Sequence, residues 1–158
     1  MVTSLPAPRG TGTVHPHDTR MARIARRVLE RDRYACWICG HGEMTATGRP
    51  GYAAADGIDH VVPAAECEVR GISLWDGNNM RAAHSKRQCP VCAQAAAALG
   101  NTTPGNRAGY CNAMRGSLSI QAARLKIAKR TGLEIVGLDA SAYEGNRPAG
   151  QRGERSWD

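Results

Sequence analysis

The chain has 158 residues, a formal net charge of +7 and only 4% aromatic residues, with no phenylalanine. This length predicts one domain, and a core without large rings buries little apolar area, so we expect a metal or disulfide staple. No apolar stretch reaches the length of a membrane span, and residues 1–10 lack the apolar run of a secretory signal. We therefore expect a cytoplasmic protein without a membrane partner, whose six cysteines bind metal rather than form disulfides.

The N-terminal part of the sequence combines a tail with a basic helix. Residues 1–17 are rich in Pro, Gly and Thr and show no periodicity, which predicts a flexible tail. From Asp18 to about Arg31, apolar residues recur at helical spacing and arginines occupy much of the remaining surface. These arginines and the net charge favour a polyanionic partner such as nucleic acid, and a solvated helix face explains the arginines equally well.

A compact Cys-x-x-Cys knuckle follows within residues 34–41. Its thiols belong to Cys36 and Cys39, and the glycine that comes next, Gly40, permits a tight turn. Two thiolates at this spacing fold around one cation and form half of a tetrahedral zinc site. The other half has to come from elsewhere in the chain.

The segment around Asp59 and His60 predicts short strands that carry chemistry. Two strands are expected within residues 53–62, on either side of the turn signal Asp56-Gly57. The second of them holds a carboxylate and an imidazole side by side. A carboxylate can hold a hydrophilic cation, and an unprotonated imidazole can take a proton from water. The pair therefore indicates metal-assisted hydrolysis.

The C-terminal half contains a loose segment, a helix and a tail. Residues 85–110 hold an alanine run and a stretch without clear pattern. Helical character begins at Cys111 and continues to about Arg130, and Gly132 stops it. Residues 133–158 are rich in glycine and charge, which predicts a basic, flexible tail.

The second half of the zinc site has two candidate pairs. Cys89 and Cys92 repeat the Cys-x-x-Cys spacing, and spacing alone favours them. The alternative is His84 with Cys111, which a long excursion separates. Cys67 has no partner at ligand spacing and is expected to be a small buried residue.

The order of these features resembles the HNH nuclease family, and most closely the small HNH proteins of actinobacterial phages. The order is the knuckle, Asp-His-x-x-Pro, Asn79, and Cys111-Asn112 at the start of a helix. The resemblance runs from about residue 27 to residue 130, and it rests on residues 28–40, 58–63, 78–84 and 110–116. It implies an α+β fold: a small ββα-metal (HNH) domain over residues 18–132, with a structural zinc knuckle, flanking helices, flexible tails, and 85–110 as an insertion.

The resemblance also implies catalytic roles. His60 matches the general base of the family. Asn79 matches the residue that ties the active-site loop to the strands and orients that histidine. Asp59 and Asn112 match the ligands of a catalytic divalent cation, for which Mg²⁺, Mn²⁺ and Ni²⁺ are the candidates.

For the structural zinc, the family places its second pair of ligands where His84 and Cys111 fall, although a long insertion separates them here. Because Cys111 adjoins Asn112, placing that asparagine at the catalytic ion brings Cys111 close to the zinc. The expected ligands are Cys36, Cys39, His84 and Cys111, with Cys89 and Cys92 as alternates.

The expected function is a metal-dependent endonuclease that nicks or cleaves DNA with low sequence specificity. Arg81 and Arg115 are expected to contact the phosphate backbone, which positions DNA without reading its sequence. A lone active site predicts nicking unless the protein forms a homodimer, and the resemblance suggests a phage terminase as partner in DNA packaging. The alternative is an inactive zinc-stapled DNA-binding or packaging-adaptor module, in which Asp59 and His60 are structural.

Overall fold

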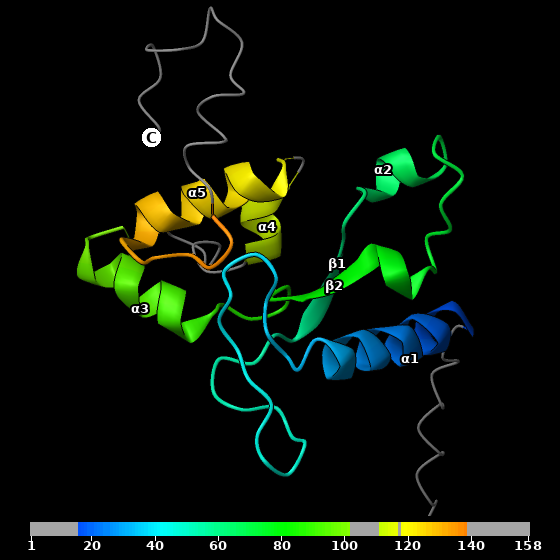
Figure 1. Cartoon of the computed structure of the whole chain (residues 1–158), viewed down its shortest axis with the longest axis horizontal. Coiled ribbons are helices and arrows are strands. Elements are labelled where there is room, and N and C mark those ends of the chain that lie inside the picture. The colour runs from blue at the N-terminus through cyan, green and yellow to red at the C-terminus, as the bar shows by residue number, and fades with distance from the viewer. Residues whose placement is uncertain (1–15, 102–110, 117, 139–158) are drawn as a thin grey trace, which may run out of the picture.

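The computed structural model describes residues 16–101, 111–116 and 118–138, which form a small α+β fold around a two-stranded sheet. Figure 1 shows α1 along one side of the strands, with α3, α4 and α5 gathered on the other. The predicted α+β class is therefore confirmed. The elements are α1 (Pro16–Arg31), β1 (Gly57–His60), α2 (Ala64–Cys67), a 3₁₀ turn (Gly77–Asn79), β2 (Met80–Ala83), α3 (Pro90–Ala98), α4 (Cys111–Arg115) and α5 (Ile120–Thr131).

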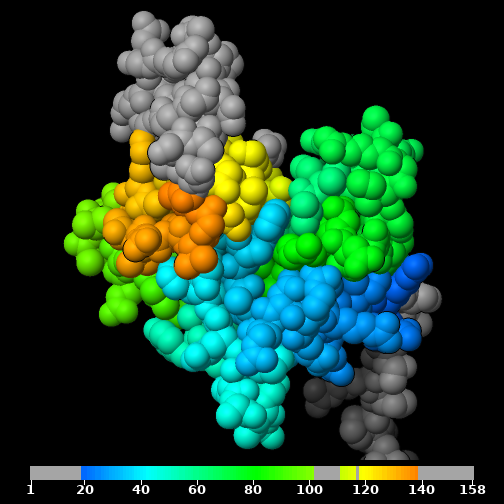
Figure 2. Space-filling view, viewed as in Figure 1, coloured from blue at the N-terminus to red at the C-terminus, as the bar shows by residue number. Residues whose placement is uncertain are grey.

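Helix α1 ends where the sequence predicts and is fastened to β2 at that end. The carboxylate of Asp32 accepts a hydrogen bond from the backbone N–H of Ala82 at 2.8 Å. The guanidinium of Arg31 donates to the carbonyl oxygen of Met80 at 2.6 Å and pairs with Asp32 at 2.7 Å. One turn earlier, Val28 is buried. The last turns of the helix thus pack on the sheet, and the arginines of its first turns stay exposed. Figure 2 shows α1, in blue, at the surface of the molecule.

The two strands pair across a long loop, and the hairpin expected within residues 53–62 does not form. Strand β1 is antiparallel to β2, with Asp59 opposite Arg81 and His60 opposite Met80. The turn signal is used differently, because the carboxylate of Asp56 accepts from the backbone N–H of Ser85 at 2.9 Å. Asp56 therefore ties the start of β1 to the chain that leaves β2.

The core of the protein is built around sulfur. Five of the six cysteines belong to the buried core cluster, together with small and aliphatic side chains. All six cysteines belong to the described residues, and none of them forms a disulfide bond. The largest fully buried apolar side chains are Ile38, Met80 and Ile127. A core of this composition buries little apolar area, because the central side chains are cysteines rather than large aromatic rings.

The C-terminal helical region consists of two helices, α4 and α5, rather than one. Helix α5 begins after Ser119, whose hydroxyl accepts from the N–H of Ala122 at 3.2 Å, and ends at Gly132 with a φ of +68°. The predicted glycine stop is therefore confirmed. Residues 133–138, the first part of the predicted tail, belong to the described residues, and Ile135 among them is buried in the core with only 3% exposed.

Residues 1–15 and 139–158, which make up most of the two predicted tails, lie outside the described residues, as do 102–110 of the predicted insertion. The described part of that insertion is ordered chain that includes α3, and α3 packs against α5. Among the described residues, no helix combines the length and apolar character that crossing a membrane requires.

Candidate metal centre and active site

Four side chains from three segments converge on one point in the core. They are buried, and their ligand atoms all lie within 4.8 Å of one another: Cys36, Cys39, His84 and Cys111. The Nδ1 atom of His84 lies 3.6 Å from the Sγ atom of Cys39 and 3.8 Å from that of Cys111. Ligands of a tetrahedral zinc ion, at about 2.0–2.3 Å from the metal, lie about 3.6–3.8 Å from each other. This cluster can therefore hold a structural metal ion such as zinc, and we call it cluster A.

The imidazole of His84 is oriented as a metal ligand by its other nitrogen. Its Nε2 atom lies 2.7 Å from the carbonyl oxygen of Ala53, which can only accept a hydrogen bond. Nε2 therefore carries the proton, and Nδ1 presents its lone pair to the thiols. A hydrogen bond from the ring nitrogen that does not bind the metal is the usual way in which proteins fix the tautomer of a ligating histidine.

A second group of potential ligands adjoins the first. It consists of Cys39, His41, Cys89 and Cys92, again within 4.8 Å of one another, and we call it cluster B. The two candidate pairs, Cys89 with Cys92 and His84 with Cys111, thus both reach the knuckle, and Cys39 belongs to both clusters. The sequence analysis did not identify His41 as a candidate ligand. The signal was its position directly after Cys39-Gly40, because a tight turn at Gly40 can bring the next side chain close to the thiol of Cys39.

The thiols of the two clusters strongly influence one another's protonation. Contact with Cys111, and then with Cys36, Cys89 and Cys92, raises the pKa of Cys39. Burial raises the pKa of Cys36, but contacts with Cys111, Cys39 and His84 outweigh it and hold that pKa well below the usual thiol range. Ionising one thiol therefore hinders the next, and full ionisation of the group requires a cation between the sulfur atoms.

His60 lies at the end of β1, and its imidazole is fixed by a loop contact. Its Nε2 atom is 3.1 Å from the carbonyl oxygen of Leu74, so Nε2 is the donor and carries the proton in the neutral ring. The Nδ1 lone pair is then available as a proton acceptor. The family resemblance implies that Asn79 orients this ring, whereas the contact that the structure shows is with a backbone carbonyl oxygen.

Asn79 clamps the chain that leaves β1. Its side-chain oxygen accepts from the N–H of Val62 at 2.8 Å, and its amide nitrogen donates to the carbonyl oxygen of the same residue at 3.2 Å. The amide also contacts the Sγ atom of Cys67 at 3.3 Å. Asn79 thus ties the loop after His60 to β2 through backbone contacts rather than by touching the imidazole, and Cys67 is buried as expected.

Asn112 lies on α4, directly beside the strand that carries Asp59. Its backbone N–H donates to the carbonyl oxygen of His84 at 3.1 Å. Its side-chain nitrogen lies 3.5 Å from the carbonyl oxygen of Ile58. Because Cys111 belongs to cluster A, the start of α4 is held against both strands at this point.

Asp59 is shielded and already has a positively charged partner. Its Oδ2 atom accepts from the indole N–H of Trp37 at 3.0 Å and from the guanidinium of Arg115. Among the described Cys, His, Asp and Glu side chains, the groups compact enough for a metal ion are clusters A and B, and neither includes Asp59. Both contacts engage Oδ2, so Oδ1 is the atom that a cation would use.

The two arginines predicted to contact DNA occupy different environments. Arg115 is 4% exposed, and its guanidinium also donates to the carbonyl oxygen of Val61 at 3.0 Å. The predicted phosphate contact of Arg115 is therefore corrected to an internal role. Arg81 is half-buried, and its guanidinium donates to the carbonyl oxygens of Asn78 and Met80 at 3.1 and 2.9 Å.

Comparison with known proteins adds no family assignment. No family model, curated protein or solved structure matches the chain. The function has to be argued from the geometry of the residues themselves.

Proposed function

We propose that the protein is a metal-dependent DNA endonuclease of the HNH type, with His60 as its general base. The observation that carries the proposal is the contact of His60 Nε2 with the carbonyl oxygen of Leu74. In the neutral ring this contact places the proton on Nε2 and directs the basic lone pair to Nδ1. The ring is therefore prepared to accept a proton from an attacking water.

The surroundings of His60 support the proposal because they are built from two strands and a helix. Strands β1 and β2 pair directly, and α4 is tied to β1 through Asn112. Asn79 closes the loop that follows the histidine. These contacts hold β1, β2 and α4 together at the end of the strand that carries His60. General-base catalysis needs a base that is held in position in this way.

A catalytic cation would have to bind beside the ion pair that Arg115 forms with Oδ2 of Asp59. The oxygen donors that would hold it are the Oδ1 atom of Asp59 and the side-chain carbonyl of Asn112, which suit a hard divalent ion. Such an ion would supply charge neutralisation to the phosphodiester. Arg115 already neutralises part of the carboxylate charge through Oδ2. The chain's own residues therefore contribute a base, a carboxylate and a fixed guanidinium.

The exposed face of α1 supports DNA as the substrate. Besides Arg31, which is held against the sheet, four of its arginines are exposed: Arg20, Arg23, Arg26 and Arg27. With a net charge of +7, this face attracts a phosphate backbone without distinguishing sequence. Cluster A contributes structurally in this proposal, because a zinc ion there holds the start of α4 against the knuckle.

The test is cleavage of supercoiled plasmid DNA with Mg²⁺, Mn²⁺ or Ni²⁺, with and without EDTA. We expect nicked product from the wild type and a loss of about 100-fold or more in His60→Ala. The matched control is Val61→Ala, which changes the exposed neighbouring side chain and should leave the rate unchanged. Equal activity of wild type and His60→Ala, or no cleavage with any of the three metals, would refute the proposal.

The buried Asp59–Arg115 pair favours a second candidate, a DNA-binding module without catalysis. In that case Asp59 is a structural partner of Arg115, and the two side chains are only 12% and 5% exposed. The same plasmid assay distinguishes the two functions. Retardation of the plasmid without cleavage, in all three metals, is the result expected for a binding module.

A further inference from the structure

We propose that the protein holds two structural metal ions rather than one, bridged by the thiolate of Cys39. One ion would lie in cluster A and the other in cluster B. The terminal ligands would be Cys36, His84 and Cys111 on the first ion and His41, Cys89 and Cys92 on the second. Zinc fits both, because each set combines thiols with one imidazole.

The number of ligands is the first argument. Each cluster offers four ligand atoms within 4.8 Å of one another, which is the number that a structural zinc ion requires. Because the clusters share one member, seven side chains supply eight coordination positions. A zinc ion in cluster A alone would leave the imidazole and both thiols at the other end without a cation.

The distances between the imidazole nitrogen and the sulfur atoms in cluster B are close to those in cluster A. The Nδ1 atom of His41 lies 3.6 Å from the Sγ atom of Cys89 and 3.4 Å from that of Cys92. These separations match the spacing of about 3.6 Å between a nitrogen and a sulfur ligand on a tetrahedral zinc ion. The backbone N–H of Cys92 also points at the Sγ atom of Cys89, at 3.5 Å, at the start of α3. This N–H can donate to the sulfur atom of Cys89 when that sulfur binds a metal ion.

The position of Cys39 makes it the bridge. Its thiol is in contact with those of Cys36 and Cys111 of cluster A and those of Cys89 and Cys92 of cluster B. It is 1% exposed, so water does not compete for its lone pairs. A thiolate has enough lone pairs to bind two cations, and sharing it is the arrangement that completes both tetrahedra.

The charge of the site also favours two ions. Five thiols lie in one buried region, and the negative charges of five thiolates at such short distances would repel one another. Two divalent cations neutralise four of these five charges, whereas one cation neutralises only two. The guanidinium of Arg124, which donates to the carbonyl oxygen of Trp37 at 2.6 Å, interacts electrostatically with Cys36 and offsets part of the remainder.

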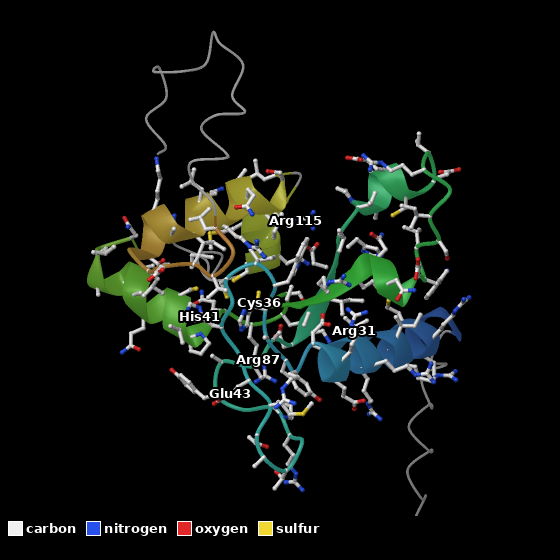
Figure 3. All side chains as sticks on the ribbon, in the orientation of Figure 1. Arg31, Cys36, His41, Glu43, Arg87 and Arg115 are labelled. Atoms are coloured by element: carbon white, nitrogen blue, oxygen red, sulfur yellow. The ribbon has the colours of Figure 1, made fainter. Side chains whose placement is uncertain are left out.

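The second site explains what the extra Cys-x-x-Cys pair does for the fold. His41 comes from the knuckle, which Gly40 turns with a φ of +81°, and Cys89 and Cys92 come from the start of α3. Figure 3 shows His41 beside the start of α3, with Cys36 toward the strands. A metal ion in cluster B would fasten α3 to the knuckle, as cluster A fastens α4.

The test is the metal content of the purified full chain, measured by elemental analysis against protein concentration. We expect two zinc ions per chain in the wild type and one in His41→Ala. The matched control is Cys67→Ser, a buried cysteine outside both clusters, which should keep two. One zinc ion per wild-type chain, or two in His41→Ala, would overturn the proposal.

A second measurement on the wild type covers the case in which His41→Ala does not fold. Metal-free protein is titrated with Co²⁺ under anaerobic conditions, and the sulfur-to-cobalt charge-transfer absorption is followed. We expect it to rise to an end point at two equivalents, with magnetic coupling between the two ions through the shared sulfur. An end point at one equivalent, or two magnetically independent ions, would contradict a bridged pair. Neither measurement depends on DNA cleavage.

Discussion

The guanidinium of Arg115 is ion-paired with the carboxylate of Asp59, and the two side chains are 5% and 12% exposed. The same guanidinium lies over the ring of Trp37 at 4.8 Å from its centroid and donates to the backbone of His60. Arg115 ends α4, whereas Asp59 lies in β1. The pair therefore locks the helix to the strand beside the proposed base.

The strength of this pair can be measured with a double-mutant cycle. We expect Arg115→Ala to lower the free energy of unfolding by about 3–5 kcal/mol, because it leaves a shielded carboxylate without its partner. Asp59→Asn should remove most of that penalty when both changes are combined. Urea denaturation of the four proteins gives the coupling energy. Effects that add within about 0.5 kcal/mol would show that the pair is not energetically coupled.

The clamp made by Asn79 should matter for stability as well as for activity. Asn79→Ala leaves the N–H of Val62 without its 2.8 Å partner, and we expect a loss of about 2–3 kcal/mol. Asn78→Ala is the matched control, since Asn78 is the exposed neighbour, and it should change stability by less than about 0.5 kcal/mol. Thermal or urea denaturation compares the two variants. Similar losses in both would contradict the clamp.

Asp32 gives a pH-dependent prediction. Burial raises the pKa of this carboxyl, but hydrogen bonds from Arg31 and from the N–H of Ala82 outweigh it, so the pKa lies below its ordinary value. A lowered pKa in the folded state stabilises the protein above the unfolded value, near 3.9, and this contribution is lost as the pH falls through the folded pKa. Asp32→Asn should therefore cost about 1 kcal/mol at pH 7.

The stability gap between wild type and Asp32→Asn is the quantity to follow with pH. It should stay constant from pH 7 to about pH 5 and narrow below about pH 4. Because both proteins carry the same metal-binding side chains, loss of metal in acid affects both alike. Glu30→Gln, an exposed acidic neighbour, serves as the control and should show no gap. A stability difference that widens in acid would mean that the folded state raises the pKa of Asp32. That result would exclude a stabilising role for the ionised carboxylate.

The segment after α5 should contribute to the core. Ile135→Ala removes a side chain that is 3% exposed, and we expect a loss of about 2–4 kcal/mol. Val136→Ala, at a position that is 77% exposed, should change stability by less than about 0.5 kcal/mol. Chemical denaturation measures both. If the two variants are equally stable, residues 133–138 do not pack on the core in solution.

Metal removal should act on the whole fold. A strong chelator is expected to lower the melting temperature markedly, because the ligand clusters occupy the centre of a small core. Zn²⁺ should restore the transition, whereas Mg²⁺ should not, since thiolates and imidazoles are poor ligands for magnesium. Calorimetry before and after each addition makes the comparison. A melting temperature that the chelator leaves unchanged would contradict a structural metal.

Local patterns in the sequence were enough to predict the helix that ends at Arg31, the helical region that ends at Gly132, and the knuckle, but not α2 or α3. The helix up to Arg31 and the stop at Gly132 follow from periodicity and from the left-handed conformation that glycine permits. The pairing of β1 with β2 could not be predicted in this way. Hydrogen bonds between the two strands depend on the path of the loop that connects them, and local sequence does not determine that path. Asp56 shows the difference: a residue that is typical of a tight turn instead binds Ser85.

The sequence by itself determined which residues are able to bind metal and to accept a proton, because thiols, imidazoles and carboxylates have these properties in any fold. Only the tertiary structure decided how they are combined. It brought both candidate ligand pairs to Cys39, added His41, and placed Arg115 against Asp59 instead of on the surface. The physical reason is that a ligand set is defined by distances of a few ångströms between side chains, and those distances are set by packing between segments far apart in the chain.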